Sequence, residues 1–597
     1  MIDLDILEID LTTSEIKRYS NPELFEKWIG GVGVGINLLN KIVPATADPL
    51  DPDNALIFSI GLLSTFYPII SKTAVLFRSP LTGDLGESYA GGRLSLAMRF
   101  SGLGAIIIKG QAEKSCYITI TGDEVQIKKS GPLAYMYTTT IGQVLREKIP
   151  VGSGRRSSIR IGPASENGIL YGNIIVDSFR HFGRLGGGSV MGSKGLKAII
   201  ITGDKDISLD NPSINRKEYL KTYKKIWSEA VNSTTMRKYH VLGTPENILP
   251  LNAINALPTR NFQKGKFELA EEISGEKFVN DYLGRRVSCN TCPVGCIHVA
   301  LLRERYGSDS PADIHSIAVP YDFELLYALG SNLEIGNGID VLKLIEQTER
   351  LGMDAITTGG VLGWLAEAFE KEVITLDDTK GQTIRFGNVQ DFLTIINLIA
   401  FRNKEEKDLF WYAGEGIHSL VTKYGGKDFS VIINSNPPAG YSTGPLTVLG
   451  HLIGGRHSHL DNAGYALDQK IFHTKLDPQE IVQQLVIEEE WRNVLNSLVL
   501  CLFARNIYPI STILECFSNL GVEKSQDDLL SLGKEIQAAR IQTKIKFGMH
   551  YRSIFENLST RFFQMPTAHG LIPKNIFYDT YFPIFQNLIA SRYSIKI

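Results

Sequence analysis

The sequence predicts a multidomain α+β protein, with a β-rich N-terminal domain followed by a mainly α-helical remainder. The first observation is length: 597 residues exceed what one hydrophobic core can organise, so roughly two to four domains are expected. The second is a change of pattern near residue 206. Short β-branched runs between glycine turns occupy residues 1–206, and longer segments with apolar residues at three- and four-residue spacing follow.

The first 206 residues are expected to be mostly strands. Residues 3–10 alternate between apolar and polar side chains, and Thr12 to Glu15 predict a hairpin turn after them. Other β-branched runs bounded by Gly, Asp or Lys predict strands at 105–110, 117–120, 173–176 and 197–202.

The remaining two thirds is expected to be mainly helical. Helical periodicity predicts helices at 214–232, 338–351, 359–372, 386–403, 480–504 and 526–547. A break near residue 425, where KYGGKD precedes a predicted short strand at 430–434, suggests a further boundary. The predicted domains are therefore residues 1–206, 207–424 and 425–597.

Composition excludes several classes of protein. With 62 Lys and Arg against 64 Asp and Glu, the net charge of −2 gives no global field for nucleic acid or an anionic membrane. The N-terminus MIDLDILEID lacks the features of a signal peptide, and no run of eighteen apolar residues predicts a membrane span. We therefore expect a cytoplasmic protein with neither a nucleic-acid nor a membrane partner. Six cysteines are too few for a disulfide scaffold in a chain of this size.

The sharpest local signal is the motif Cys289-x-x-Cys292-x-x-x-Cys296. Three thiolates within eight residues can gather at one centre, and Cys501, near the end of a predicted helix, is the candidate fourth ligand. The spacing favours an iron–sulfur cluster, whereas a zinc site and structural thiols stay open as alternatives.

Two glycine-rich stretches, Tyr89–Arg93 and Gly183–Lys194, lie in the β-rich part. Their backbone N–H groups, flanked by Arg180, Arg184 and Lys194, are suited to a phosphate or another polyanion. Neither stretch fits the Walker A spacing or the dinucleotide fingerprint, so taken alone they are more simply explained as β-turns.

Seven collinear blocks of the sequence resemble the aldehyde ferredoxin oxidoreductase family of tungsten enzymes. The blocks lie at 79–114 (SPLTG to GQAEK), 161–199, 289–296 (C-x-x-C-P-x-G-C), 323–332 (FELLYALGSN), 351–360 (LGMDAITTGG), 454–457 (GGRH) and 500–503 (LCLF). The resemblance implies an N-terminal domain of two sheets and two mainly helical domains, with the cofactor at their junction. That cofactor would be tungsten, or molybdenum, held by two molybdopterins, with a 4Fe–4S cluster nearby.

The resemblance also assigns the cofactor-binding residues. It makes Cys289, Cys292, Cys296 and Cys501 the cluster ligands. The cofactor-binding positions it implies are Lys72, Tyr89, Ala90, Gly91, Gly92, Arg180, His181, Gly183, Arg184, Glu349, Asp354, Asn496 and Leu500. Both pterin patterns, 349–354 and 496–501, lack the family's leading Asp, and Lys72 replaces an Arg. Because Tyr89 replaces the Asn that ligates Mg²⁺, magnesium is less firmly implied than tungsten.

For catalysis, the resemblance points to Glu324 and His457. A carboxylate there can take the proton of an attacking water, and an imidazole can donate a hydrogen bond to an oxygen of the metal or the substrate. The implied reaction oxidises an aldehyde to a carboxylic acid and passes electrons through the cluster to ferredoxin or a ferredoxin-like subunit. His459 and Asp461 depart from the family pattern, and could shape the substrate pocket or bind an extra ion.

Two alternatives stay open. NSNPPAGYST at 434–443 replaces the family's Y-D-P-R-G. Because of this difference, the first alternative is that the chain is the catalytic subunit of a tungsten-dependent aromatic acyl-CoA reductase of the benzoyl-CoA type. Both pterin patterns lack their leading Asp, so the second alternative is a relative that keeps the fold, binds no metal and serves as a scaffold. The family's interface-iron motif E-x-x-H corresponds here to Lys343–Glu346, so we expect any homodimer to form without interface iron.

Overall fold

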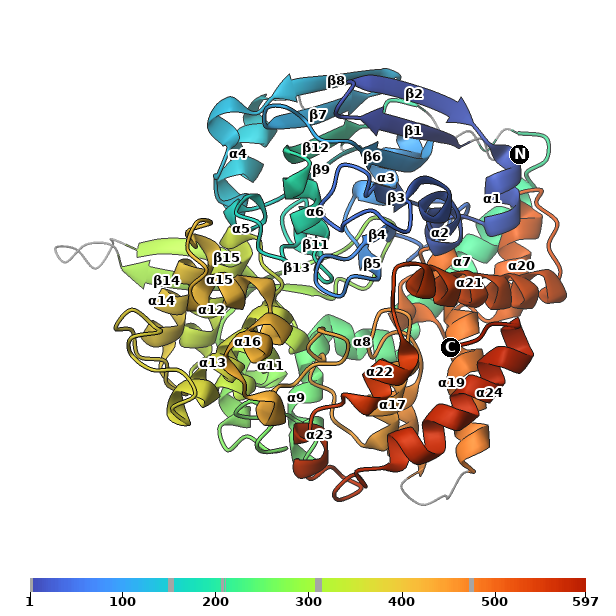
Figure 1. The fold of residues 1–597 in the computed structure, drawn as a ribbon. Helices are drawn as coiled ribbons and strands as arrows, with labels where there is room; N and C mark the ends of the chain where they lie inside the picture. The colour runs from blue at the N-terminus through green and yellow to red at the C-terminus, as the bar shows by residue number, and fades with distance from the viewer. Residues whose placement is uncertain (1–3, 149–154, 206–208, 210, 306–313, 472–476) are drawn as a thin grey trace.

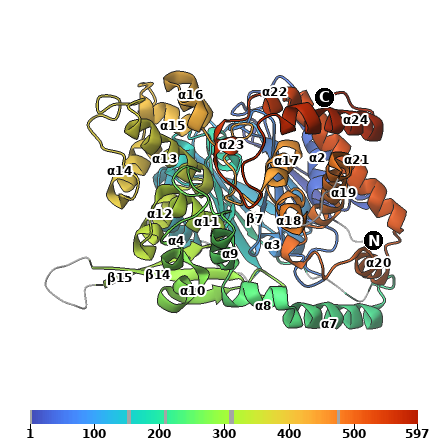
Figure 2. The same ribbon diagram turned by 90° about the horizontal axis from the view of Figure 1, so that it is seen from below.

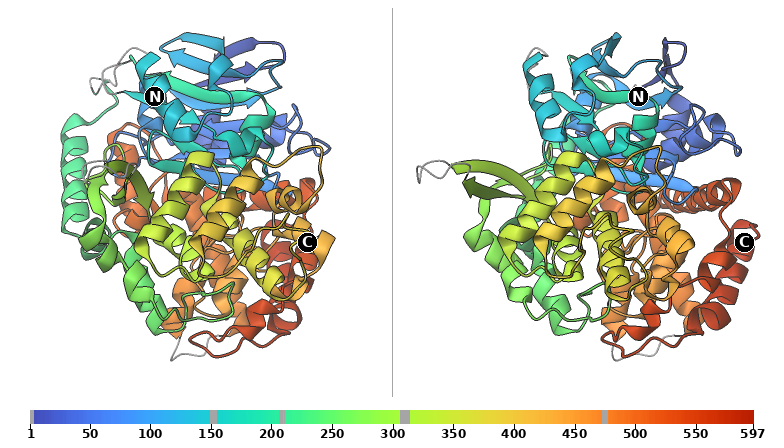
Figure 3. Two further views of the ribbon diagram at one scale, coloured as in Figure 1. Left: turned by 90° about the vertical axis from the view of Figure 1, so that its left-hand side faces the viewer. Right: turned by 60° about the vertical axis from the view of Figure 1, so that its left-hand side comes forward.

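The computed structural model describes residues 4–148, 155–205, 209, 211–305, 314–471 and 477–597. Two six-stranded sheets form the N-terminal part, and helices from the rest of the chain lie against one side of it (Figures 1 and 3). This arrangement confirms the predicted α+β fold. No helix among the described residues is both long and apolar enough to cross a membrane.

The first sheet has the strand order β2-β1-β6-β3-β4-β5 and the second β11-β10-β9-β12-β7-β8. The strands of the first sheet are β1 (Asp5–Asp10), β2 (Glu15–Ser20), β3 (Leu56–Ser59), β4 (Thr73–Arg78), β5 (Leu85–Ala90) and β6 (Leu103–Lys109). Those of the second are β7 (Cys116–Thr121), β8 (Glu124–Lys129), β9 (Arg156–Arg160), β10 (Ile174–Val176), β11 (Arg180–Phe182) and β12 (Leu196–Thr202). The predicted hairpin of β1 and β2 and the four other predicted strands are confirmed.

Successive side chains of a strand point to opposite faces of the sheet, and on the first sheet both faces carry buried apolar side chains. On β6, Ile106 and Ile108 join the apolar core between the two sheets, whereas Ile107 joins a second core shared with helices. That second core contains α2 (Gly31–Ile42) together with side chains from α19 (Pro478–Ser497) and α21 (Gln526–Lys546). The first sheet is therefore buried between the second sheet and the helical part.

The helices are listed here in chain order. Within the β-rich part lie α1 (Pro22–Trp28), α2, α3 (Leu94–Phe100), α4 (Thr138–Lys148), α5 (Pro163–Glu166) and α6 (Gly187–Ser193). The middle of the chain forms α7 (Arg216–Asn232), α8 (Thr234–Val241), α9 (Ile248–Ala253), α10 (Gly275–Asp281), α11 (Phe323–Leu329), α12 (Gly338–Leu351), α13 (Ala355–Glu370), α14 (Val389–Ala400), α15 (Leu409–Glu415) and α16 (Ile417–Tyr424). The last part forms α17 (Pro445–Ile453), α18 (Gly464–Lys470), α19, α20 (Ile510–Asn519), α21, α22 (Tyr551–Glu556), α23 (Arg561–Gln564) and α24 (Phe582–Tyr593).

Figure 2 shows α11 to α16 on one side of the helical part and α17 to α24 on the other. One apolar core contains residues of both groups. The predicted boundary near residue 425 remains a prediction.

Two predictions of secondary structure need correction, and one sheet was not predicted at all. The helix predicted over 480–504 ends at Ser497, because Val499 adopts a left-handed φ of +54° that a helix cannot continue through. The strand predicted at 430–434 is wrong, since the segment forms only a single bridge between Ile433 and Asn436. A three-stranded sheet was not predicted: β13 (Leu283–Val287), β14 (Ile297–Arg305) and β15 (Ile314–Tyr321).

The turn after α19 is pressed against the β-rich part. A Cβ on Gly31 would lie 2.3 Å from the backbone oxygen of Asn496, and one on Gly61 would lie 2.5 Å from that of Leu498. The N–H of Gly33 also donates to Ser497 Oγ at 3.1 Å. Only glycine permits this approach, which packs residues 496–498 against α2 and the end of β3.

Candidate functional site

Four cysteines from two distant segments meet around one residue of the β-rich part. They are Cys289, Cys292 and Cys296 on the loop between β13 and β14, and Cys501 beyond α19; all four are free and partly buried. The N–H of Ile69 donates to Thr291 O at 3.1 Å, and its carbonyl accepts from the N–H of Cys501 at 3.2 Å. These backbone bonds tie both cysteine segments to the loop before β4.

Burial raises the pKa of Cys296 to about 12, and the Cys501 and Cys289 thiols add to the rise. Burial likewise raises the pKa of Cys292. Thiols in such surroundings stay protonated unless a metal or a cation stabilises the thiolate.

Gly91 allows Cys289 to lie close to the chain after β5. A Cβ on this glycine would lie 2.5 Å from Cys289 Sγ, 3.7 Å from Arg180 Nε and 3.8 Å from Lys72 Cδ. Arg180 Nε is buried and has no hydrogen-bond partner among the described residues. A buried unpaired donor costs about 1–3 kcal/mol. This position therefore fits an anionic group that the chain itself does not supply.

The cysteines are not arranged around a single ion. In the part of the chain that the structure describes, no three His, Cys, Asp or Glu side chains converge as ligands of one metal ion. Each cysteine of a cubane cluster binds a different iron atom, so its four sulfur atoms need not converge on a point. Four cysteines are the donor set of a cubane cluster, so they fit the predicted iron–sulfur centre, and the choice between this cluster and zinc stays a prediction.

The predicted cofactor-binding residues on β11 and just after it lie near the segments of the first pterin pattern. His181 Nε2 lies 2.6 Å from Glu349 Oε2, at the end of α12. Arg184 Nε lies 3.3 Å from Asp354 Oδ2, and its Nη2 donates to Asn436 Oδ1 at 2.6 Å. Arg184 Nη1 is buried without a partner among the described residues, so one guanidinium nitrogen remains for an anion.

Asp354 is already engaged within the fold. It caps α13 by accepting from the N–H of Ile356 at 3.0 Å, and it also accepts from the Thr357 hydroxyl. To bind a pterin as predicted, Asp354 would have to contact it while its carboxylate also caps α13.

Tyr89 and Gly92 lie at the end of β5. The Tyr89 hydroxyl donates to Glu87 Oε1 at 2.7 Å, and the Arg456 guanidinium lies 5.0 Å from the centre of its ring. Gly92 has a φ of +98° that strains any other residue, and its carbonyl accepts from the N–H of Asn290 at 3.0 Å. This bond fastens the motif cysteine loop to the first glycine-rich stretch.

The other predicted cofactor-binding residues lie in different surroundings. Ala90 is the last residue of β5, and Leu500 is buried in the core shared with α19. Asn496 is also buried, whereas an added Cβ on Gly183 would have its nearest heavy atom at 3.9 Å. The N–H of Lys72 donates to Val499 O at 3.1 Å, which places its backbone beside the turn before Cys501.

Glu324 lies in the first turn of α11. The Tyr441 hydroxyl donates to its Oε1 at 3.3 Å, and His459 Nε2 lies 3.5 Å from the same oxygen. Burial raises the pKa of Glu324 to about 8, and the charge of the neighbouring Asp322 adds to the rise. The carboxyl group is therefore held near the point where it can both give and take a proton at neutral pH.

His457 is fully occupied by hydrogen bonds within the chain. Its Nδ1 lies 2.8 Å from His451 O and therefore carries the proton, leaving Nε2 to accept from Lys544 Nζ at 3.1 Å and Asn434 Nδ2 at 3.2 Å. Burial, with the charge of Lys544, lowers the pKa of His457. The ring is neutral, and the hydrogen bond predicted from it to a substrate or metal oxygen would require one of these partners to move.

The imidazole that faces Glu324 is His459, whose role the sequence left open. Its ring packs on Tyr441 with centroids 4.3 Å apart, and its Nδ1 is buried with no partner among the described residues. Burial, with the nearby His451, lowers the pKa of His459 well below its usual value. The H-x-H spacing on one loop was the only sequence signal for it.

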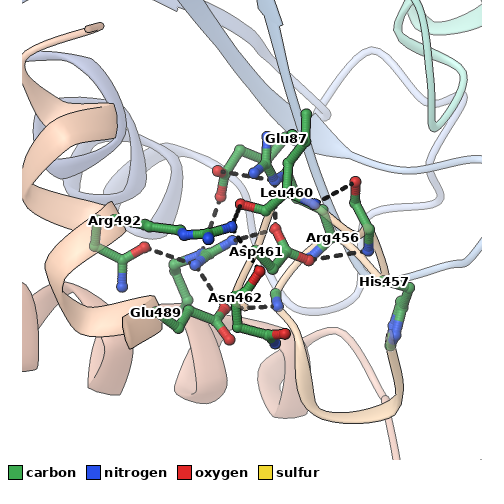
Figure 4. A network of polar contacts seen from close by, with 12 residues as sticks. Glu87, Arg456, His457, Leu460, Asp461, Asn462, Glu489 and Arg492 are labelled. Atoms are coloured by element: carbon green, nitrogen blue, oxygen red, sulfur yellow. Dashed lines mark hydrogen bonds and ion pairs between the residues drawn. The ribbon is translucent and has the colours of Figure 1, made fainter. Parts of the chain in front are cut away.

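A buried ion-pair network fixes the loop that carries both histidines (Figure 4). Arg456 Nε lies 2.6 Å from Asp461 Oδ1, and the N–H groups of Arg456 and Ser458 donate to Asp461 Oδ2 at 2.8 and 3.0 Å. Arg540 Nε lies 3.0 Å from Glu87 Oε2, and its Nη1 lies 2.9 Å from Glu489 Oε1. Asp461 is therefore engaged as a structural anion rather than as a ligand for an extra ion.

The chain matches two models of one family along most of its length. The model described as aldehyde ferredoxin oxidoreductase, N-terminal domain, matches residues 6–203, and that described as aldehyde ferredoxin oxidoreductase, domains 2 and 3, matches residues 220–593. A tungsten-containing aldehyde ferredoxin oxidoreductase of Thermococcus kodakarensis is 31% identical over 580 residues, covering 94% of this chain and 92% of the relative.

Two further similarities extend the comparison. The WOR-like subunit of an aliphatic sulfonate oxidoreductase of Pyrococcus furiosus is 29% identical over 435 residues, covering 70% of this chain and 66% of the relative. Among solved structures, the active site complex BamBC of benzoyl coenzyme A reductase with 1,5-dienoyl-CoA superposes with a TM-score of 0.78 at 18% identity. That match covers 99% of this chain and 93% of the other, and at such identity it supports the fold alone.

Proposed function

The chain belongs to the aldehyde ferredoxin oxidoreductase family, and we propose that it is a cytoplasmic enzyme that oxidises an aldehyde to a carboxylic acid. Electrons would pass through a 4Fe–4S cluster to ferredoxin or a ferredoxin-like subunit. The observation that carries this proposal is the meeting of two distant cysteine segments at Ile69, where Cys289 closely approaches Gly91 and Arg180 Nε has no partner among the described residues.

The residues present fit the cofactors that this reaction needs. Cys289, Cys292, Cys296 and Cys501 would hold the cluster, and Lys72 with the residues of β11 would hold the anionic parts of a tungsten or molybdenum bis-molybdopterin. When bound, that group supplies the two-electron acceptor for the aldehyde. The Tyr89 hydroxyl is engaged by Glu87, so the proposal does not require Mg²⁺.

The side chains around Glu324 supply the proton chemistry. Oxidation follows RCHO + H₂O → RCOOH + 2 H⁺ + 2 e⁻, so a water must lose a proton as it adds to the carbonyl carbon. In its ionised form Glu324 takes that proton at a carboxylate oxygen, while Tyr441 and His459 hold the carboxyl group in place. Their burial limits the access of other water to the reacting carbon.

A homodimer would form without interface iron. Lys343 lies 3.7 Å from Asp340, and Glu346 lies 3.6 Å from Arg350, so both ends of the corresponding motif are engaged in surface ion pairs. Chelators should therefore leave the oligomeric state unchanged.

The proposal is tested on anaerobically purified protein. We expect tungsten or molybdenum and about four iron atoms per chain, the electron paramagnetic resonance signal of a reduced cubane, and aldehyde-dependent reduction of a dye. Protein that contains iron but neither heavy metal, and does not oxidise aldehydes, would contradict it. Elemental analysis thereby also decides the scaffold alternative.

A second candidate is the catalytic subunit of an aromatic acyl-CoA reductase of the benzoyl-CoA type. Aromatic rings pack around Tyr441, whose hydroxyl donates to Glu324: Phe323 lies 4.4 Å and Tyr465 5.2 Å from its ring, centroid to centroid. Such surroundings suit a planar ring. Parallel assays with aldehydes and with an aromatic CoA thioester plus a strong reductant distinguish the two reactions.

A further inference from the structure

An arginine-rich cavity opens between the second sheet and the unpredicted three-stranded sheet. It encloses about 690 Å³ and is lined by residues of α4, β9, β15 and the turn between β10 and β11. A neighbouring cavity of about 270 Å³ shares Arg93, Arg146 and Arg285 with it. Figure 1 shows α4 and β15 at the edge of the molecule away from α21.

The lining of the larger cavity is strongly positive. Its arginines are Arg93, Arg146, Arg156, Arg160 and Arg285, against two acidic residues, Asp177 and Glu346. The chain as a whole carries a net charge of −2, so this positive charge is a local concentration rather than a property of the entire surface.

The acidic residues do not neutralise the exposed arginines. Asp177 accepts from the Ser157 hydroxyl at 2.9 Å and from the backbone N–H of Arg93 at 3.0 Å. Glu346 lies 3.6 Å from Arg350, which is not part of the lining, so its charge is already engaged outside the cavity. Arg93, Arg146 and Arg285 have exposed side chains, and within the described ranges none of them forms an ion pair. Their charges are therefore available to a negatively charged partner.

The smaller cavity reaches the back of the cysteine loop. Its wall includes Ser288 and Ile297, the residues on either side of the 289–296 motif. It also includes Gly92, whose carbonyl accepts from the N–H of Asn290, and Arg180, which like Cys289 lies close to Gly91. The arginine-rich surface thus adjoins the place where the cluster is proposed to bind.

We propose that this surface is the docking site of a small acidic one-electron carrier protein. The inference rests on the proposed function and adds to it the place of electron exit and the charge of the partner. Each aldehyde oxidised releases two electrons, so two oxidised carriers dock in turn and each leaves reduced by one electron. Positive charge around the exit site steers an acidic carrier toward it and holds it there long enough for transfer.

A small polyanion is the competing occupant, because cavities of about 300–1,000 Å³ commonly bind small ligands. The carrier is favoured by two observations. The unpaired arginines are exposed to solvent rather than enclosed, and the cavity wall continues to the cysteine loop.

The test compares charge reversals inside and outside this surface. The variants are Arg146→Glu and Arg285→Glu, singly and together, with Lys534→Glu on the exposed face of α21 as the matched control. The probe is an acidic bacterial-type ferredoxin. Its binding to the holoenzyme is measured by calorimetric titration without substrate, and its reduction rate is compared with that of a dye.

At low salt we expect each reversal to weaken ferredoxin binding about tenfold, and the double variant more, while high salt removes most of the difference. Dye reduction should stay within about twofold of the wild type, as should all properties of Lys534→Glu. Unchanged ferredoxin binding by the double variant overturns the inference. Tight binding of inorganic pyrophosphate, combined with unchanged ferredoxin binding, would overturn it in favour of a small polyanion.

Failure of the proposed function gives a different result. A wild type that reduces no dye with any aldehyde contradicts the proposed reaction. The titrations still decide the docking site in that case, because they measure binding and need no turnover.

Discussion

The protonation state of Glu324 should set the pH dependence of aldehyde oxidation. Burial raises its pKa to about 8 and the charge of Asp322 adds to this, whereas the Tyr441 hydroxyl opposes the rise. The proposed reaction needs the ionised carboxylate, so activity should be lost as pH falls below that pKa. At pH 7 only about one molecule in ten would carry the charge, and kcat/KM should rise about tenfold per pH unit before levelling off above about pH 8.

Substitutions of the neighbours of Glu324 should move the midpoint of this pH profile in either direction. Asp322→Asn removes a negative charge and keeps the oxygen that accepts the Leu325 N–H at 3.2 Å, so the helix cap survives. A shift of about one pH unit to the acid side corresponds to about 1.4 kcal/mol, a modest part of the repulsion between two close carboxylates. Tyr441→Phe removes a donor to the charged form and should move the midpoint to higher pH.

The assay is the initial rate of dye-linked aldehyde oxidation between about pH 5.5 and 9.5, expressed as kcat/KM. Asp340→Asn, at the partly exposed start of α12, serves as the matched control and should leave the profile unchanged. Glu324→Gln should lower the rate by about 10²-fold at the plateau and leave metal content intact. Superimposable profiles for the wild type and Asp322→Asn, or a shift toward higher pH, would refute the reasoning.

The remaining predictions concern the cluster and the buried charges. Cys296→Ser should abolish the iron–sulfur absorbance and dye-linked activity, and an unchanged spectrum would remove this residue from the ligand set. Gly91→Ala places a Cβ 2.5 Å from a motif sulfur and should lower iron content with the circular dichroism spectrum unchanged, whereas Gly183→Ala, with 3.9 Å of space, should keep its iron. Arg540→Met should cost about 3–5 kcal/mol of the free energy of unfolding in urea, against less than about 1 kcal/mol for the exposed Arg552→Met. Equal stability of the two arginine variants would contradict the importance of the buried network.

Strands and helices could be predicted from the sequence wherever their burial produces a recognisable pattern of apolar residues. The strands β6 and β12 are buried apolar runs, and α12 and α14 bury one face, so their patterns are unambiguous. The strands β13 and β15 are largely exposed, and an exposed strand has no need to alternate. The end of α19 was missed for another reason. Its apolar spacing continues beyond Ser497, but contact with the β-rich part imposes a left-handed φ at Val499.

In the candidate site, too, features within a short segment could be predicted from the sequence, whereas contacts between distant segments could not. The cysteine spacing lies within eight residues and is visible in the sequence. The role of Ile69 is not, because it joins the two cysteine segments through backbone groups that every residue except proline has. The choice between His457 and His459 as the neighbour of Glu324 also depends on tertiary packing, since Lys544 and Asn434 occupy the first and Tyr441 packs on the second.

The buried charges explain how the loop that carries His457 and His459 keeps its place beside the proposed cofactor site. Glu87 comes from β5, Glu489 from α19 and Arg540 from α21, and all three are almost fully buried. A Cβ on Gly455 would lie 2.1 Å from Arg540 Nη2, so the loop backbone packs directly on this guanidinium. Ion pairs so deeply buried contribute little net stability, but loss of one partner leaves an uncompensated charge. Substitutions in this network should therefore lower stability and activity together, whereas those at Glu324 should lower activity alone.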